Sequence, residues 1–197
     1  EQCWVGHVNT SPTQPHLISF CHEGPWTLVD CRIWCMDITT GHAWKVRPST
    51  ATNECVGHEY WMAGGLRLGY HGHAPGPDGQ LRPVFGSIRY DNTDRIEVPF
   101  ASKSKHYHSA ALDVIVGDGN PQNPRVLLWQ RRGEGFDGPR IVARHDGSWR
   151  IQQLHVHPRL SPDGRSVVYT ADPHAYGNVY LAELPENLDE LPLWRPK

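Results

Sequence analysis

Two short histidine patterns in the second half of the chain have the spacing of metal ligands. In Gln152-Gln153-Leu154-His155-Val156-His157 two imidazoles stand at i and i+2, and alternate residues of a strand project from the same face. Such a pair can bind one ion. Gln152 lies three residues before His155, so it joins the pair only if the backbone bends or bulges there. His106-Tyr107-His108 repeats the i, i+2 spacing. Together the two patterns predict a metal site.

Two side chains in the first half of the chain could also carry chemistry. His58, in Gly57-His58-Glu59-Tyr60-Trp61, is either a neutral general base or a histidine satisfied in a hydrogen-bond network. Arg32, which precedes Ile33, either pairs with a carboxylate of the fold or clamps an anionic ligand with its planar fork. The residue types leave both choices open.

Short strands must position these residues. Glycine (19) and proline (17) are spread evenly along the 197 residues, and the apolar runs between them are short. This pattern is typical of an all-β protein. The clearest unit runs from Leu154 to Leu184, where Ser161-Pro162-Asp163-Gly164 predicts a tight turn and residues 167–170 and 178–181 predict strands.

The same plan of histidine, turn and strand occurs four times. The copies open at His7, His58, His106 and His157, and their spacing of roughly 45–50 residues is the size of a propeller blade. We therefore predict a β-propeller with about four blades, in which each opening histidine lies near the central channel. A β-sandwich is the alternative.

Two segments are expected outside the regular strands. Residues 71–85, HGHAPGPDGQLRPVF, are rich in glycine and proline and predict a loop. The segment after Leu184 is rich in proline and acidic residues, and we expect it to lie over the last blade as a tail.

Composition excludes several classes of partner. The formal net charge of −2 offers no broad basic field for nucleic acid or anionic lipid. No apolar run reaches the roughly 18 residues of a membrane span. The five cysteines form no CxxC pair and are interpreted as reduced core thiols. We expect a cytoplasmic protein with no nucleic-acid or membrane partner, and the sequence gives no indication of its oligomeric state.

The ordered motifs of the chain resemble those of the oligogalacturonate lyases. The resemblance covers the chain from about His7 to Leu184, and these motifs carry it: HVNTSPTQPHLISFCHEGPW, D-x-R-I-W, GHEYW, VGDG, and Q-x-x-H-x-H-x-x-x-SPDG with NVYL. Members of this family are seven-bladed propellers about twice as long. The resemblance therefore implies that residues 1–197 are a partial lyase domain, the last four blades of the ring.

The resemblance also implies a manganese site built from three histidines and a glutamine. The Q-x-x-H-x-H motif would supply Gln152, His155 and His157. The remaining histidine falls in KHYHS, where we expect His106, because it lies about as far before VGDG as the family's ligand does. The stretch after His106 is shorter than in the family, so His108 remains the alternative. Imidazole ligands alone favour zinc or another late transition metal, so manganese rests on the resemblance.

The activity implied by the resemblance is β-elimination on small oligogalacturonides. Unsaturated digalacturonate would be cleaved to 5-keto-4-deoxyuronate, which completes pectin breakdown. His58 would be the base that removes the C5 proton, and Arg32 would assist at the substrate carboxylate. Positive charge on that carboxylate stabilises an enolate-like intermediate. The alternative function is a non-catalytic propeller that serves as a platform for protein interactions.

Overall fold

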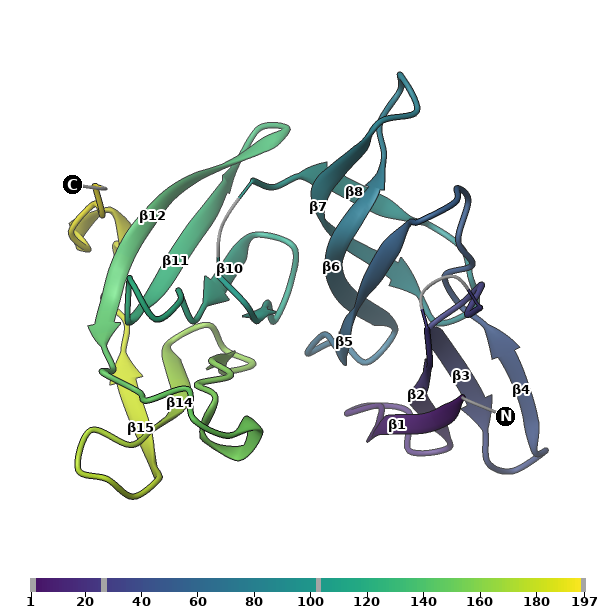
Figure 1. Ribbon diagram of the computed structural model, residues 1–197, viewed down its shortest axis with the longest axis horizontal. Coiled ribbons are helices and arrows are strands. Elements are labelled where there is room, and N and C mark those ends of the chain that lie inside the picture. Colours follow the sequence, from purple (N-terminus) through teal and green to yellow (C-terminus); the bar gives the residue numbers. More distant parts are fainter. Residues whose placement is uncertain (1–2, 26–27, 102–103, 196–197) are drawn as a thin grey trace. The chain divides into compact units, whose positions relative to one another are not determined.

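The computed structural model describes residues 3–25, 28–101 and 104–195, so Trp26 of the quoted HEGPW run lies outside it. The chain divides into two compact units, residues 1–101 and 102–197. Each unit contains two antiparallel sheets whose strands follow one another in chain order (Figure 1). Sheets of consecutive antiparallel strands are the blades of a β-propeller, and the predicted all-β propeller fold is confirmed. No helix within the described residues is long and apolar enough to cross a membrane.

The first unit holds two four-stranded sheets. The strands of its first sheet are β1 (Trp4–Thr10), β2 (Leu17–Glu23), β3 (Ile33–Asp37) and β4 (His42–Lys45). The strands of its second sheet are β5 (Cys55–Trp61), β6 (Arg67–Pro75), β7 (Leu81–Arg89) and β8 (Ile96–Pro99). β1 and β2 both contact β5, so the strands that open the two sheets are neighbours.

The core of the first unit is built from the alternate residues of these strands. Along β2 the buried positions are every second residue, as the two-residue period of a strand requires. Buried side chains of both sheets form one cluster, which comprises Leu17, Ile33, Cys35, Val46, Val56, Trp61, Leu68, Tyr70, Ala74 and Ile88. The sheets are also joined by a buried ion pair, because the fully buried guanidinium of Arg47 bonds to the carboxylates of Glu54 and Glu97. Tyr70 donates to Glu97 at 2.7 Å.

The turns of the two sheets in the first unit are also tied together. Ser11 Oγ donates to the carbonyl of Gly65 at 2.7 Å, and Thr13 Oγ1 donates to that of Gly64 at 3.0 Å. Gly65 has a left-handed φ of +68°, and a Cβ at this residue would lie 2.1 Å from Thr13 Oγ1. The close approach of the turns therefore requires glycine here.

The second unit holds a four-stranded and a three-stranded sheet. The strands of the first are β9 (Tyr107–His108), β10 (Val114–Gly117), β11 (Arg125–Arg132) and β12 (Gly135–Arg144). The second follows a 3-10 turn, η1 (Gln152–Leu154), and comprises β13 (Arg159–Leu160), β14 (Ser166–Ala171) and β15 (Asn178–Glu183), with a second 3-10 turn, η2 (Leu188–Glu190), after it. β13 contacts both β9 and β10. The predicted SPDG turn is present, since the Gly164 amide donates to the Ser161 carbonyl at 2.9 Å.

The prediction of a loop over residues 71–85 was wrong. β6 continues to Pro75 and β7 begins at Leu81, so most of this segment is a long hairpin in which His73 pairs with Pro83. Gly72, Pro75 and Pro83 lie within the strands, whereas Gly76, Pro77 and Gly79 form the turn between them. A Cβ at Gly72 would lie 1.9 Å from the Cys55 carbonyl oxygen, which shows that the backbones approach too closely for any side chain there.

The end of the chain lies along a different sheet from the one expected. The amide of Ile141 donates to the Pro192 carbonyl at 2.8 Å, and the amide of Trp194 donates to the Pro139 carbonyl at 2.9 Å. The tail therefore pairs with β12, the outer strand of the preceding sheet. An edge strand offers unpaired backbone groups, and Asp189 of the tail adds ion pairs with Arg132 and Arg140 of this sheet.

Candidate metal centre

His155 and His157 were expected on a strand, but they lie between η1 and β13. η1 ends at Leu154, β13 begins only at Arg159, and His157 adopts a left-handed φ of +41°. The expected bend that brings in the glutamine is present, because the η1 turn places Gln152 Nε2 3.4 Å from His157 Nε2. The side-chain amide can present either its nitrogen or its oxygen there after a rotation of 180°. The irregular backbone, rather than strand alternation, thus gathers these side chains.

Three histidines of the second unit converge on one point. One ligand nitrogen from each of His106, His155 and His157 lies within 4.8 Å of the other two. The ring centroids of His106 and His157 are 3.9 Å apart, and those of His106 and His155 are 5.5 Å apart. His106 is buried and His157 is exposed, so the group opens to solvent on one side. This spacing fits a single ion with bonds of about 2.0–2.3 Å.

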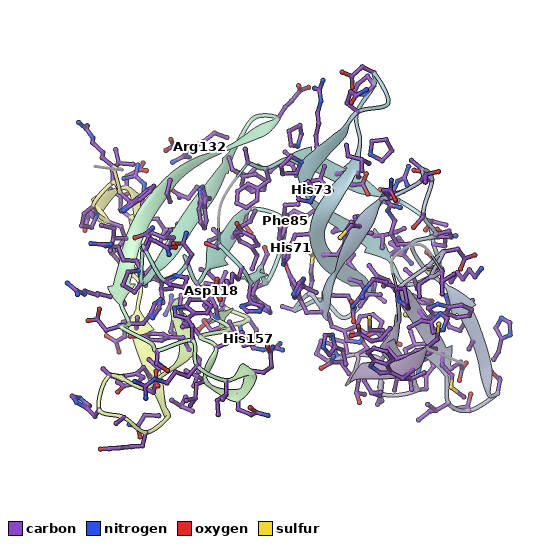
Figure 2. The ribbon with its side chains drawn as sticks, viewed as in Figure 1. His71, His73, Phe85, Asp118, Arg132 and His157 are labelled. Atoms are coloured by element: carbon purple, nitrogen blue, oxygen red, sulfur yellow. The ribbon has the colours of Figure 1, made fainter. Side chains whose placement is uncertain are left out.

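Asp118 holds the ring of His106 in place. Its Oδ2 lies 2.5 Å from His106 Nδ1, and its Oδ1 accepts from the backbone amides of Lys105 and His106 at 2.9 Å each. Because Nδ1 of His106 faces the carboxylate, its Nε2 is the ring nitrogen that points away from Asp118. A carboxylate behind a histidine ligand fixes its tautomer and increases its basicity. Asp118 lies in the VGDG motif but was not predicted as a site residue. Figure 2 marks Asp118 and His157 in this unit.

The structure brings His106, and not His108, to the other two histidines. His108 is buried, and its Nδ1 accepts from the backbone amide of Leu160 at 3.1 Å, which links β9 to β13. Burial lowers the pKa of His108 to about 3, so this imidazole stays neutral at any physiological pH. His108 therefore has a structural role in joining the two sheets.

The remaining surroundings also suit a metal ion. Nδ1 of His155 is buried, and no group among the described residues makes a hydrogen bond to it. A buried polar atom of this kind indicates a missing partner. Burial and the neighbouring His106 lower the pKa of His155, which favours the neutral form that a metal requires. The indole of Trp149, which was not predicted as part of the site, lies against His155 with ring centroids 5.3 Å apart.

His58 belongs to the first unit, where a bulge directs its side chain. The pairing of β5 with β6 shifts register between Gly57 and Tyr60, and His58 has a φ of +52° within this bulge. Bulges commonly re-aim a side chain near a functional site. The ring of His58 stacks on that of His71, with centroids 4.6 Å apart and an interplanar angle of 10°. His71 lies on β6 and is marked in Figure 2.

Arg32 forms the carboxylate pair that was one of its two expected roles. Its Nη2 donates to Glu23 Oε2 at 2.9 Å, and only 12% of its side chain is exposed. Its Nε would lie 3.1 Å from a Cβ at Gly57, so the guanidinium group lies against the residue that precedes His58. Arg32 and His58 thus both belong to the first unit, where Arg32 lies against Gly57, while Gln152 and the three clustered histidines belong to the second.

The fold and this histidine cluster define a β-propeller protein with a candidate metal centre. Comparison of the sequence with known families gives a match to the family described as "Oligogalacturonate lyase" over residues 1–188. The chain belongs to the oligogalacturonate lyase family, as its motifs predicted.

Individual relatives agree with this family. The chain is 26% identical to the oligogalacturonate lyase of Dickeya dadantii (strain 3937) over 208 residues, which cover 95% of this chain and 52% of the relative. Among solved structures, an oligogalacturonate lyase in complex with manganese matches with a TM-score of 0.74 and 28% identity, over 95% of this chain and 50% of that one. An oligogalacturonate lyase from Vibrio parahaemolyticus matches with a TM-score of 0.74 and 25% identity, over 93% of this chain and 50% of that one. The chain therefore spans about half the length of these relatives.

Proposed function

We propose that this chain, as part of a complete propeller, belongs to a manganese-dependent lyase that cleaves short oligogalacturonides, chiefly unsaturated digalacturonate. The observation that carries the proposal is the convergence of His106, His155 and His157 in a member of this family. The solved relative in complex with manganese supports the choice of ion.

The ion would be held by four side chains, those of His106, Gln152, His155 and His157. Three neutral imidazoles and an amide carry no negative charge, so the ion would keep its full positive charge for an anionic ligand. When bound, it would supply that charge to the substrate carboxylate. Asp118 would keep His106 oriented throughout, because its carboxylate holds Nδ1.

The first unit would supply the base and a second positive charge. His58 would take the C5 proton, which is α to the carboxylate. The electron pair of the C5–H bond would form the C4–C5 double bond as the C4–O bond breaks, and the departing oxygen would take up a proton. Arg32 would stabilise the charge that develops on the carboxylate, and its pairing with Glu23 would fix the direction of the guanidinium group.

The test is the substitution His58→Ala in the full-length protein supplied with manganese. Turnover of unsaturated digalacturonate should fall by about 10²–10⁴, the usual contribution of a general base, while metal content stays unchanged. His174→Ala, at an exposed histidine in the second unit, is the matched control and should keep full activity. Wild-type turnover in His58→Ala would refute the base. An inactive wild-type protein, complete and loaded with manganese, would refute the lyase itself.

A further inference from the structure

A second group of ligand-type side chains lies in the first unit. One ligand atom from each of His7, Cys21 and Glu23 lies within 4.8 Å of the other two. His7 is on β1, while Cys21 and Glu23 are on β2, which pairs with it. These residues come from the HVNTSP and CHEGPW runs, to which the proposed function assigns no metal or catalytic base.

The imidazole of His7 lies between two carboxylates and turns a different nitrogen toward each. The pairing of β1 with β2 shifts register between Gly6 and Asn9, and His7 has a left-handed φ of +48° there. Its Nε2 lies 3.8 Å from Glu23 Oε1, and its Nδ1 lies 3.5 Å from Glu59 Oε1. Nε2 therefore faces the side of the ring where Glu23 offers an oxygen.

Glu59 is the observation that points to a ligand. Its side chain is fully buried, and among the described residues the imidazole of His7, 3.5 Å from Oε1, is the one ion-pair partner of its carboxylate. A buried carboxylate is costly unless a positive charge or a donor compensates for it. The Glu59 carboxylate faces Nδ1 of His7, just as the Asp118 carboxylate faces Nδ1 of His106. A carboxylate in this position orients a histidine whose other nitrogen binds a metal.

We propose that His7, Cys21 and Glu23 bind a second divalent metal ion, with Glu59 accepting the Nδ1–H of His7. The distance of 3.8 Å from His7 Nε2 to Glu23 Oε1 is a few tenths of an ångström longer than the edge of about 3.3–3.6 Å that a tetrahedron with nitrogen and oxygen bonds of about 2.0–2.2 Å has, so a small side-chain movement would let both atoms bind one ion. A thiolate in the set selects a thiophilic ion such as Zn²⁺ and disfavours Mn²⁺. Binding releases the thiol proton of Cys21 to solvent. Three protein ligands leave one position for water, and the half-exposed His7 gives access to it.

The charges of the group balance in the presence of such an ion. Arg32 bonds to Glu23 Oε2, which leaves Oε1 facing His7. The two carboxylates and the thiolate are then offset by the ion and the guanidinium group. Without an ion, Glu59 and Glu23 raise the pKa of His7, and a protonated imidazole would leave a plain network of ion pairs. The experiment must therefore distinguish a bound metal from a bound proton.

Cobalt(II) distinguishes them, because it replaces zinc and gives a thiolate-to-metal charge-transfer band in the near ultraviolet. The centre at His106, His155 and His157 contains no thiol and cannot produce this band. Titration of the metal-free chain with cobalt should therefore give a saturable band. The double variant His155→Ala/His157→Ala should keep it, and Cys21→Ser should lose it. Cys35→Ser, at an equally buried cysteine on β3, is the matched control and should keep it.

Two further variants keep the proposal falsifiable if Cys21→Ser does not fold. His7→Asn changes a half-exposed residue and retains a side chain that tolerates the left-handed backbone, so it should fold and lose the band. Glu59→Gln should weaken cobalt binding by about 10–100-fold. Absence of the band from the wild-type chain, or its persistence in His7→Asn, would overturn the proposal. The site does not depend on the lyase activity, so its failure would leave the proposed function standing.

Discussion

Asp118 Oδ2 lies 2.5 Å from His106 Nδ1, and this contact joins a fully buried carboxylate to the candidate metal centre. Glu59 stands in the same relation to His7 in the other unit, at 3.5 Å. In both units, therefore, a buried carboxylate lies at Nδ1 of a histidine and directs its Nε2 toward the candidate metal position. Its contribution can be measured directly at Asp118.

Asp118→Asn should weaken manganese binding by about 10–100-fold, because the neutral amide no longer holds His106 Nδ1–H as a charged acceptor does. Isothermal titration calorimetry on the metal-free protein measures the affinity. Asp146→Asn is the control, since Asp146 is exposed and bonds to Arg144. Equal affinity in Asp118→Asn and the wild type would contradict the role given to Asp118.

Arg32→Lys should lower kcat/KM for unsaturated digalacturonate by about 10–100-fold, the equivalent of the 1.5–3 kcal/mol of a hydrogen bond to a charged group. An ammonium group cannot bond to Glu23 and to a substrate carboxylate in the fixed directions of a guanidinium fork. Steady-state kinetics and thermal unfolding should be recorded together on the full-length protein. A large loss of stability with unchanged kinetics would assign Arg32 to the fold alone.

Arg47→Met should destabilise the chain by about 3–5 kcal/mol, because it leaves the carboxylates of Glu54 and Glu97 without their buried cation. The change in the free energy of unfolding can be measured with urea. Arg82→Met is the matched control. Arg82 pairs with Asp78 on the surface, and an exposed pair contributes at most about 1 kcal/mol. Similar losses in both variants would argue against the importance of the buried network.

His108 predicts a specific dependence of stability on pH. Burial lowers its pKa from 6.5 to about 3. Between about pH 3 and pH 6.5 the imidazole is therefore protonated in the unfolded chain and neutral in the folded chain. Stability should therefore be fully present above about pH 6.5 and fall progressively toward pH 3. His108→Asn keeps an acceptor for the Leu160 amide but does not titrate, and its unfolding free energy should decline less steeply over this window. Parallel profiles for the two proteins would contradict the assignment.

The sequence was sufficient for the repeated plan of the fold and for the residues of the candidate metal centre. The SPDG turn and the short runs at residues 167–170 and 178–181 predicted β14 and β15, because turn and strand signals are local properties. The histidine patterns supplied His155 and His157, and the family resemblance favoured His106 over His108; the structure brings the nitrogens of these three together. Their role as metal ligands, like that of His58 as a base, stays a proposal.

Other features depend on contacts that no local pattern encodes. Asp118 lies 12 residues from His106 in sequence, and the pairing of β10 with β9 makes them neighbours. The tail pairs with β12 through backbone groups and through ion pairs of Asp189 with Arg132 and Arg140, and no local pattern indicates which sheet it contacts. The convergence of His155 and His157 also depends on a left-handed residue, and histidine does not indicate such a conformation in the way that glycine does.

Three of the four histidines that open the repeats share this conformation, with φ values of +48° at His7, +52° at His58 and +41° at His157. A side chain in this region of backbone space costs of order 1–3 kcal/mol, and glycine would avoid most of that cost. Selection for heat resistance alone should therefore favour glycine at all three positions. Mutagenesis for thermal stability should leave these three histidines unchanged. Glycine there would increase the free energy of unfolding, but it would remove the imidazoles to which the proposed chemistry is assigned.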